Sequence, residues 1–146
     1  KLHLVGDGEL REELQQQIEA LNLKNKVILG KAETDMLTVY KNASVLAMSS
    51  RYEGLPMVLL EAQAAGLPIV SFQCKCGPKD VIADGVDGFL VNEGNVDALA
   101  EKLMKLMNDE ALRKKMGAAA FERSERYAED CIMKQWSDLF DVVLNC

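Results

Sequence analysis

Five short apolar runs alternate with segments of helical periodicity, and this alternation restricts the fold of the chain more than any other feature. The apolar runs predict β-strands at residues 2–5, 26–30, 44–49, 68–72 and 88–91. Helices are expected at residues 9–22, 34–43, 56–65, 95–107, 109–126 and 128–143. Strands that alternate with helices pair in parallel, because each helix returns the chain to the same end of the sheet. We therefore expect an α/β fold, a parallel sheet with helices on both faces.

The composition is that of a globular domain, because 49% of the 146 residues are hydrophobic and 27% are charged. The net charge of −6 argues against nucleic acid as a partner. No apolar run approaches the ~20 residues that cross a bilayer, and no signal peptide is recognisable. The spacing of the four cysteines matches no disulfide-rich scaffold, and we therefore expect a reduced, cytoplasmic setting. The apolar run directly after Lys1 indicates a fragment of a longer protein, and the spacing of Cys74 and Cys76 does not suit a metal site.

In an open parallel sheet the ligand lies beyond the carboxyl ends of the strands. The loops that follow the predicted strands are residues 6–8, 30–33, 49–55 and 73–79. Binding residues are therefore expected in these loops and at the start of the helix after each of them. In the last predicted helix, Trp136 and Phe140 lie four residues apart and are expected to anchor that helix to a core.

The predicted helix at 56–65 carries one carboxylate among apolar residues. At about 100° per residue, Glu61 lies about 40° around the helix axis from Met57, between Ala64 and Val58. A helix that is apolar all round is buried, and a buried carboxylate costs several kcal/mol unless it has a partner. The partner could be a ligand with two adjacent hydroxyls, such as a ribose, or alternatively a buried arginine or a helix end. If a ligand is the partner, Glu61→Leu is expected to raise the melting temperature.

The start of the same helix suits an anion. Pro56 at the first helical position has no N–H, and the N–H groups of Met57 and Val58 point outward at the positive end of the helix dipole. Gly54 allows the loop backbone to approach a ligand closely, and Glu53 lies beside it. These features suit a diphosphate, although an ordinary capped helix has the same pattern.

The segment SRYEGLPMVLLEAQAAGLPIVS resembles the E-x7-E motif of retaining glycosyltransferases with the GT-B fold, of the group 1 type. The similarity extends through VGDGELREELQ, NKVILGKA, Tyr40 with the segment ASVLAMSS, GPKDVIADGVDGFLV and the last helix. The resemblance implies that residues 1–146 are the C-terminal, nucleotide-sugar-binding domain, a Rossmann-like half that is truncated at its N-terminal side. It also implies that the acceptor site, and the arginine and lysine that hold the diphosphate, lie in the missing part.

The resemblance assigns a role to each carboxylate. Glu61 would hold the ribose hydroxyls of the donor, and Glu53 would contact the donor sugar as the catalytic residue without attacking it. The implied reaction transfers a hexose from a nucleotide-sugar, by this resemblance a UDP-sugar, with retention of configuration and without a cofactor or metal. The acceptor would be a glycan or a lipid-linked glycan in bacterial surface polysaccharide synthesis, at the inner face of the membrane.

The other donor contacts implied by the resemblance are mainly made by backbone groups. They are Gly54, Leu55, Pro56, Met57 and Val58 along the sugar and phosphates, Gly30 and Lys31 at the base, and the loop glycines Gly6 and Gly8. Between residues 51 and 100 there are three basic and seven acidic side chains, which makes this segment alone a poor host for a diphosphate.

Three other functions fit parts of the pattern. Gly6 and Gly8 could begin the dinucleotide motif G-x-G-x-x-G, but its third position is Arg11. A sugar-nucleotide epimerase or phosphorylase would share the fold, and a noncatalytic nucleotide-binding module would share the binding residues. The fragment by itself is expected to be inactive.

Overall fold

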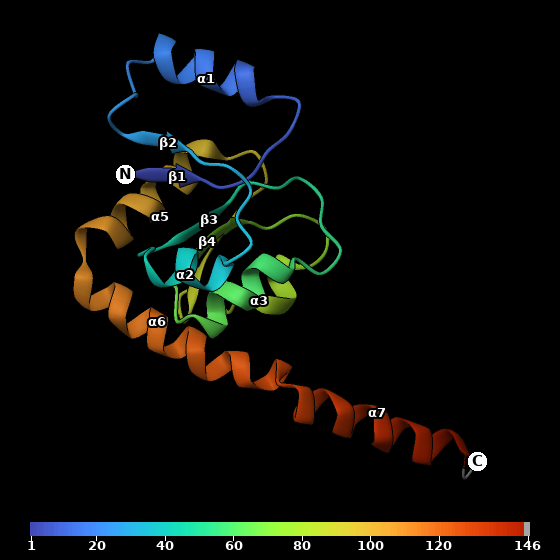
Figure 1. Cartoon of the computed structure of the whole chain (residues 1–146). Helices are drawn as coiled ribbons and strands as arrows, with labels where there is room; N and C mark the ends of the chain where they lie inside the picture. Colours follow the sequence, from blue (N-terminus) through green and yellow to red (C-terminus); the bar gives the residue numbers. More distant parts are fainter. Residues whose placement is uncertain (145–146) are drawn as a thin grey trace. The chain divides into compact units, whose positions relative to one another are not determined.

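A computed structural model describes residues 1–144 of the chain (Figure 1). The chain divides into two compact parts, Lys1–Met36 and Leu37–Cys146. No helix within residues 1–144 is both long enough and apolar enough to span a membrane.

The first part is one strand–helix–strand unit. Strand β1 (Leu2–Leu4) pairs in parallel with β2 (Val27–Leu29), and helix α1 (Arg11–Ala20) connects them. The helix ends where Asn22 adopts a left-handed backbone with φ of 55°, a conformation that asparagine tolerates better than most residues. The predicted strands at residues 2–5 and 26–30 and their parallel direction are confirmed.

The second part contains a three-stranded parallel sheet in the order β3 (Leu46–Met48), β4 (Ile69–Phe72), β5 (Gly88–Val91). All four residues of the central strand β4 are buried, as expected for a strand covered on both faces. Gly88 lies opposite Ile69, and a Cβ at Gly88 would be only 2.3 Å from the Ile69 carbonyl oxygen. Only glycine therefore allows this pair of strands to approach so closely.

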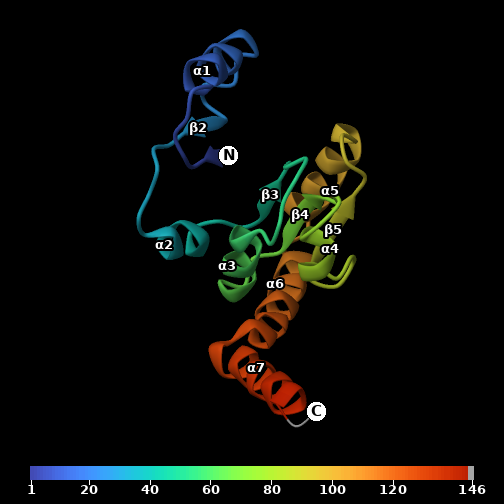
Figure 2. The same cartoon turned by 90° about the vertical axis from the view of Figure 1, so that its right-hand side faces the viewer.

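The described residues of the second part contain seven helices, the first of which begins one residue earlier, at Met36. They are α2 (Met36–Lys41), α3 (Met57–Ala64), α4 (Pro78–Val81), α5 (Val96–Asn108), α6 (Glu110–Ser124), the 3-10 helix η1 (Glu125–Tyr127) and α7 (Glu129–Leu144). Figure 2 shows α3 and α5 on opposite sides of β4. On the α5 side, Val70 and Phe89 of the sheet pack with Leu106 and Met116 in an apolar core.

The strands form two separate sheets, where a single sheet was expected. The α/β class, the parallel direction and the helices on both faces of the β3–β4–β5 sheet agree with the prediction. The one-turn helix α4 was not predicted, because four residues are too few to show helical periodicity. Residues 109–126 were expected to form one helix, but α6 ends at Ser124 and η1 continues the chain.

The expectation that Trp136 and Phe140 anchor the last helix to a core is wrong for the described chain. Their rings stack on each other, with centroids 5.7 Å apart. About half of each side chain is nevertheless exposed, and no residue of α7 is buried.

A buried polar network joins three elements of the second part. The Asp87 carboxylate is fully buried and accepts hydrogen bonds from Gln63 Nε2 at 2.9 Å, from the Ala83 N–H at 2.9 Å and from Arg123 Nε at 2.7 Å. Gln63 belongs to α3 and Arg123 to α6, so the carboxylate ties both helices to the turn before β5. Each of its oxygens has a donor, as a buried charge requires.

Candidate functional site

Helix α3 begins directly after the loop that follows β3. Pro56 caps the helix with an extended backbone, φ −74° and ψ 100°, so the prediction that it occupies the first helical position is wrong by one residue. A proline is tolerated at the cap and at the first helical position alike, because the N–H of a residue at either position has no acceptor within the helix. Within residues 1–144 the N–H groups of Met57 and Val58 have no hydrogen-bond acceptor, which leaves them free at the positive end of the helix.

The loops after β3 and β4 meet at Gly77. This residue has a left-handed backbone with φ of +90°. A Cβ at Gly77 would lie 2.5 Å from Pro56 Cδ and 2.7 Å from the Gly54 carbonyl oxygen. The Asp80 carboxylate accepts the Gly77 N–H at 3.2 Å, which holds the turn in place. The structure thus brings together two of the four loops that the sequence singled out.

Replacing Gly77 with alanine is expected to lower the free energy of unfolding by about 2–4 kcal/mol, because a left-handed backbone and a backbone clash are both penalised. A suitable control is Gly94→Ala, since Gly94 also has a positive φ of 75° but open space where its Cβ would lie. That variant should lose only about 1–2 kcal/mol. Urea denaturation measures both losses, and equal losses would show that the contact with Gly54 and Pro56 is not tight.

The expectation that Glu61 is buried is wrong. Helix α3 buries the side formed by Leu59, Ala62 and Gln63, whereas Glu61 is exposed together with Met57 and Val58. The neighbours of Glu61 around the helix axis are those predicted, but one apolar side of the helix stays uncovered by residues 1–144. Of the two partners considered for Glu61 within the fold, neither an arginine nor a helix end is present among the described residues.

The protein partner of Glu61 is a tyrosine. Tyr40 Oη donates a hydrogen bond of 2.7 Å to Glu61 Oε2, and the Tyr40 side chain is itself buried. Burial, reinforced by the hydrogen bond and the charge of Glu61, raises the pKa of Tyr40. The hydroxyl therefore stays protonated and remains a donor at physiological pH.

The exposure of Glu61 removes the reason for expecting a higher melting temperature in Glu61→Leu. An exposed carboxylate has little desolvation cost to recover. The leucine would also leave the buried Tyr40 hydroxyl without its acceptor, which is unfavourable.

The other residues predicted in the second part lie around the start of α3. Glu53 is half-buried and has no ion-pair or hydrogen-bond partner within residues 1–144. Leu55, Met57 and Val58 expose about half of their side chains. Gly54 is exposed and Pro56 is buried. A free carboxylate, free N–H groups and exposed apolar side chains thus occur together on one short segment.

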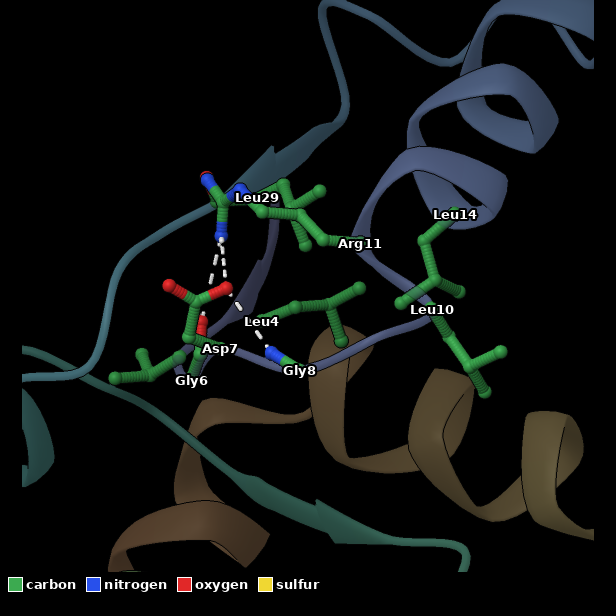
Figure 3. A pocket seen from close by; sticks show the side chains of 9 residues that line it. Leu4, Gly6, Asp7, Gly8, Leu10, Arg11, Leu14 and Leu29 are labelled. Carbon is green, nitrogen blue, oxygen red and sulfur yellow. Dashed lines mark hydrogen bonds and ion pairs between the residues drawn. The ribbon is translucent and has the colours of Figure 1, made fainter.

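In the first part, Arg11 holds the two predicted loops. Its guanidinium donates to the carbonyl oxygens of Gly30 at 2.7 Å, Leu29 at 3.0 Å and Gly6 at 3.4 Å. Figure 3 shows the guanidinium turned toward Gly6 and Asp7. The residue that breaks the dinucleotide motif therefore links the loop after β1 to the end of β2. Lys31, the next residue along, is exposed.

A hollow of about 240 Å³ lies beside this link (Figure 3). Its lining is mainly apolar and includes Leu4, Leu10, Leu14 and Leu29 together with the Gly6–Gly8 loop. Arg11 and Tyr40 were not among the predicted site residues, although both lie in segments that carry the family resemblance.

Residues 1–123 match the family model described as glycosyl transferases group 1. Among curated proteins, the amylovoran biosynthesis glycosyltransferase AmsD of Erwinia amylovora is 38% identical over 141 residues, which is 97% of this chain and 40% of AmsD. The chain spans less than half the length of the curated relatives that it matches.

Two solved structures are similar to this chain. One is a variant of TarM from Staphylococcus aureus in complex with fondaparinux, alpha-GlcNAc-glycerol and UDP, with a TM-score of 0.90 and 30% identity over 96% of this chain and 29% of that one. The other is HepE from Anabaena in complex with UDP-glucose, with a TM-score of 0.85 and 27% identity over 96% of this chain and 40% of that one.

Proposed function

The chain belongs to the group 1 glycosyltransferases and has their GT-B type of fold, and from that premise we propose that residues 1–146 form the donor-binding, C-terminal domain of a retaining glycosyltransferase. The observation that carries the proposal is the arrangement on α3. Free N–H groups at Met57 and Val58 lie at the start of the helix, and Glu61 lies one turn further along with one oxygen free of protein partners. This pairing of an anion site with a hydroxyl acceptor suits a nucleoside diphosphate.

The residues at and near the start of α3 each have a proposed contact with the donor. Glu61 accepts hydrogen bonds from the ribose hydroxyls, and the N–H groups of Met57 and Val58 donate to the diphosphate. Glu53, which has no protein partner in the described chain, accepts from the hydroxyls of the donor sugar and orients it. Gly54 lets the backbone of Leu55 and Pro56 approach the sugar.

For the first part, the proposed contacts are made by backbone groups. Gly30 and Lys31 contact the base of the donor, and Gly6 and Gly8 are donor contacts of the loop after β1. The three hydrogen bonds of Arg11 support this assignment, because they hold the carbonyl groups of both loops in one orientation. The positive charge of Arg11 is used within the fold and is not assigned to the diphosphate.

The proposed reaction moves the sugar to an acceptor hydroxyl with retention of configuration. A bond forms between the acceptor oxygen and the anomeric carbon on the face that the diphosphate leaves. The bond between the anomeric carbon and the diphosphate oxygen breaks, and that oxygen takes the proton of the acceptor hydroxyl. In this scheme Glu53 positions the sugar and forms no covalent bond to it.

The proposed donor is a UDP-sugar and the proposed product a surface polysaccharide. UDP and UDP-glucose are the nucleotides in the TarM and HepE complexes, and AmsD is named for amylovoran biosynthesis. We further propose a glycan or lipid-linked acceptor, and a cytoplasmic location at the inner face of the membrane.

Isothermal titration of the full-length protein with UDP, GDP and ADP tests the donor class. UDP is expected to bind at least about tenfold more tightly than GDP or ADP, because the base contacts at Gly30 and Lys31 distinguish pyrimidine from purine by shape. Stronger binding of a purine nucleotide would overturn the choice of UDP. Binding of none would contradict the donor-domain assignment, and a change of anomeric configuration in the NMR spectrum of the product would contradict retention.

A further inference from the structure

Tyr40 is a buried tyrosine that reaches the candidate site through one hydrogen bond. Only 4% of the residue is exposed, so its ring is part of the core of the second part. Its hydroxyl donates to Glu61 Oε2 at 2.7 Å, the length of a strong hydrogen bond to a carboxylate. The residue lies at the end of α2, 21 positions before Glu61, and therefore connects α2 to α3.

This hydrogen bond divides the acceptor sites of the Glu61 carboxylate. An ionised carboxylate has two oxygens and about four lone-pair positions. One position on Oε2 is taken by Tyr40, whereas Oε1 has no partner within residues 1–144. The remaining positions are on the exposed side of α3, because Glu61 itself is exposed. The protein thus holds one side of the carboxylate and leaves the other for a ligand.

The same hydrogen bond restricts the rotation of an otherwise mobile side chain. An exposed glutamate has several rotatable bonds and samples many rotamers. Two adjacent hydroxyls can be bound together only when both carboxylate oxygens face them, which is one orientation among many. A donor anchored in the core is well suited to select that orientation, because the tyrosine ring itself cannot move freely.

We propose that Tyr40 is a positioning residue that holds Glu61 for the simultaneous binding of the 2′- and 3′-hydroxyls, and that it thereby makes the site select ribonucleotides over 2′-deoxyribonucleotides. The inference rests on the proposed donor-binding function and adds a determinant of specificity to it. Without Tyr40, Glu61 can still meet the 3′-hydroxyl through either oxygen. The contact with the 2′-hydroxyl is the one that depends on the held orientation.

The direct test is Tyr40→Phe, which keeps the buried ring and removes only the hydroxyl. Isothermal titration of the full-length protein with UDP and 2′-deoxy-UDP gives the selectivity of each variant. The wild type is expected to bind UDP at least about tenfold more tightly than 2′-deoxy-UDP, since one charge-assisted hydrogen bond is lost. In Tyr40→Phe the affinity for UDP should fall about fivefold to tenfold, while that for 2′-deoxy-UDP should change less than about twofold.

Two further variants separate positioning from packing. Tyr127→Phe is the matched control, because it also removes one tyrosine hydrogen bond, from Tyr127 Oη to the Asp80 carbonyl, and should leave the selectivity unchanged. In Glu61→Ala the selectivity should be lost, and adding Tyr40→Phe to it should have no further effect on either affinity. Melting temperatures of all the variants show whether each one is folded.

The possible results distinguish this inference from the function on which it rests. If Glu61→Ala loses the selectivity but Tyr40→Phe keeps it, Tyr40 has only a structural role and the inference is overturned while the donor site stands. A lower melting temperature of Tyr40→Phe with unchanged selectivity leads to the same conclusion. If the wild type does not bind UDP, or if Glu61→Ala binds both nucleotides like the wild type, the proposed donor site itself is wrong.

Discussion

Replacing Asp87 with alanine is expected to lower the free energy of unfolding by about 3–5 kcal/mol, because it breaks an ion pair with a buried carboxylate and a hydrogen-bond network at once. The carboxylate is fully buried and receives donors from Gln63, Ala83 and Arg123. Its loss leaves the N–H of Ala83 without an acceptor and Arg123, about a third of whose side chain is exposed, without its partner. Such a loss is a large fraction of the ~5–15 kcal/mol by which a typical domain is stable.

Urea denaturation measures this loss, with Asp84→Ala as the matched control. Asp84 is an exposed carboxylate in the same turn, and it accepts one hydrogen bond, from the Leu90 N–H at 2.9 Å. The control should lose only about 0.5–1.5 kcal/mol. The double variant Asp87→Leu with Arg123→Met should recover part of the loss, since apolar replacement of both partners removes the unpaired groups. Equal losses at Asp87 and Asp84 would show that the network contributes little to stability.

The second large effect concerns donor binding. Glu61→Ala is expected to weaken UDP binding about 10²–10⁴-fold, because two charge-assisted hydrogen bonds to the ribose, each contributing about 1.5–3 kcal/mol, are lost together. The melting temperature without ligand should fall moderately, because the buried Tyr40 hydroxyl loses its acceptor, at a cost of about 1–3 kcal/mol. Tyr40→Phe removes the same hydrogen bond, and a loss of affinity in Glu61→Ala that exceeds the loss in Tyr40→Phe therefore comes from the contact of the carboxylate with the ligand.

The control for this experiment is Glu122→Ala. Glu122 is an exposed glutamate of α6 and has no role in the proposed site. Isothermal titration with UDP should give the same affinity for this variant as for the wild type. If Glu61→Ala also keeps the wild-type affinity, the carboxylate does not hold the ribose and the roles assigned to α3 have to be abandoned.

The strands of this protein were predictable because each is a short apolar run between turn residues. Strand β5 was predicted at residues 88–91 and is observed at Gly88–Val91. Strand β4 was predicted at 68–72 and is observed at Ile69–Phe72. Helix α4 was missed, and the division of the strands into two sheets was not foreseen. Neither feature can be read from the local sequence. A helix of one turn is too short to show a helical period, and the boundary between two sheets depends on packing between segments that are distant in the sequence.

The helix that carries Glu61 was predicted correctly, whereas the burial of Glu61 was predicted wrongly. Local pattern placed Glu61 on a helix beside Met57 and Val58, and the structure agrees. The same pattern predicted burial of Glu61, because a helix that is apolar all round is normally buried. It could not show that only one side of the helix is covered by the described residues. The roles assigned to Glu53 and Glu61 remain predictions, and the affinity measurements described above test the role of Glu61.

The sequence by itself determined the α/β class, the positions of most elements and the helix that carries the candidate carboxylate. These depend on periodicity and turn residues within about ten positions, which the linear order of residues contains. Only the tertiary structure decided which polar groups have partners. Tyr40 meets Glu61 across 21 positions and Arg123 meets Asp87 across 36. The packing of helices against the sheet sets those contacts, because a hydrogen bond requires two groups to lie within about 3 Å of each other.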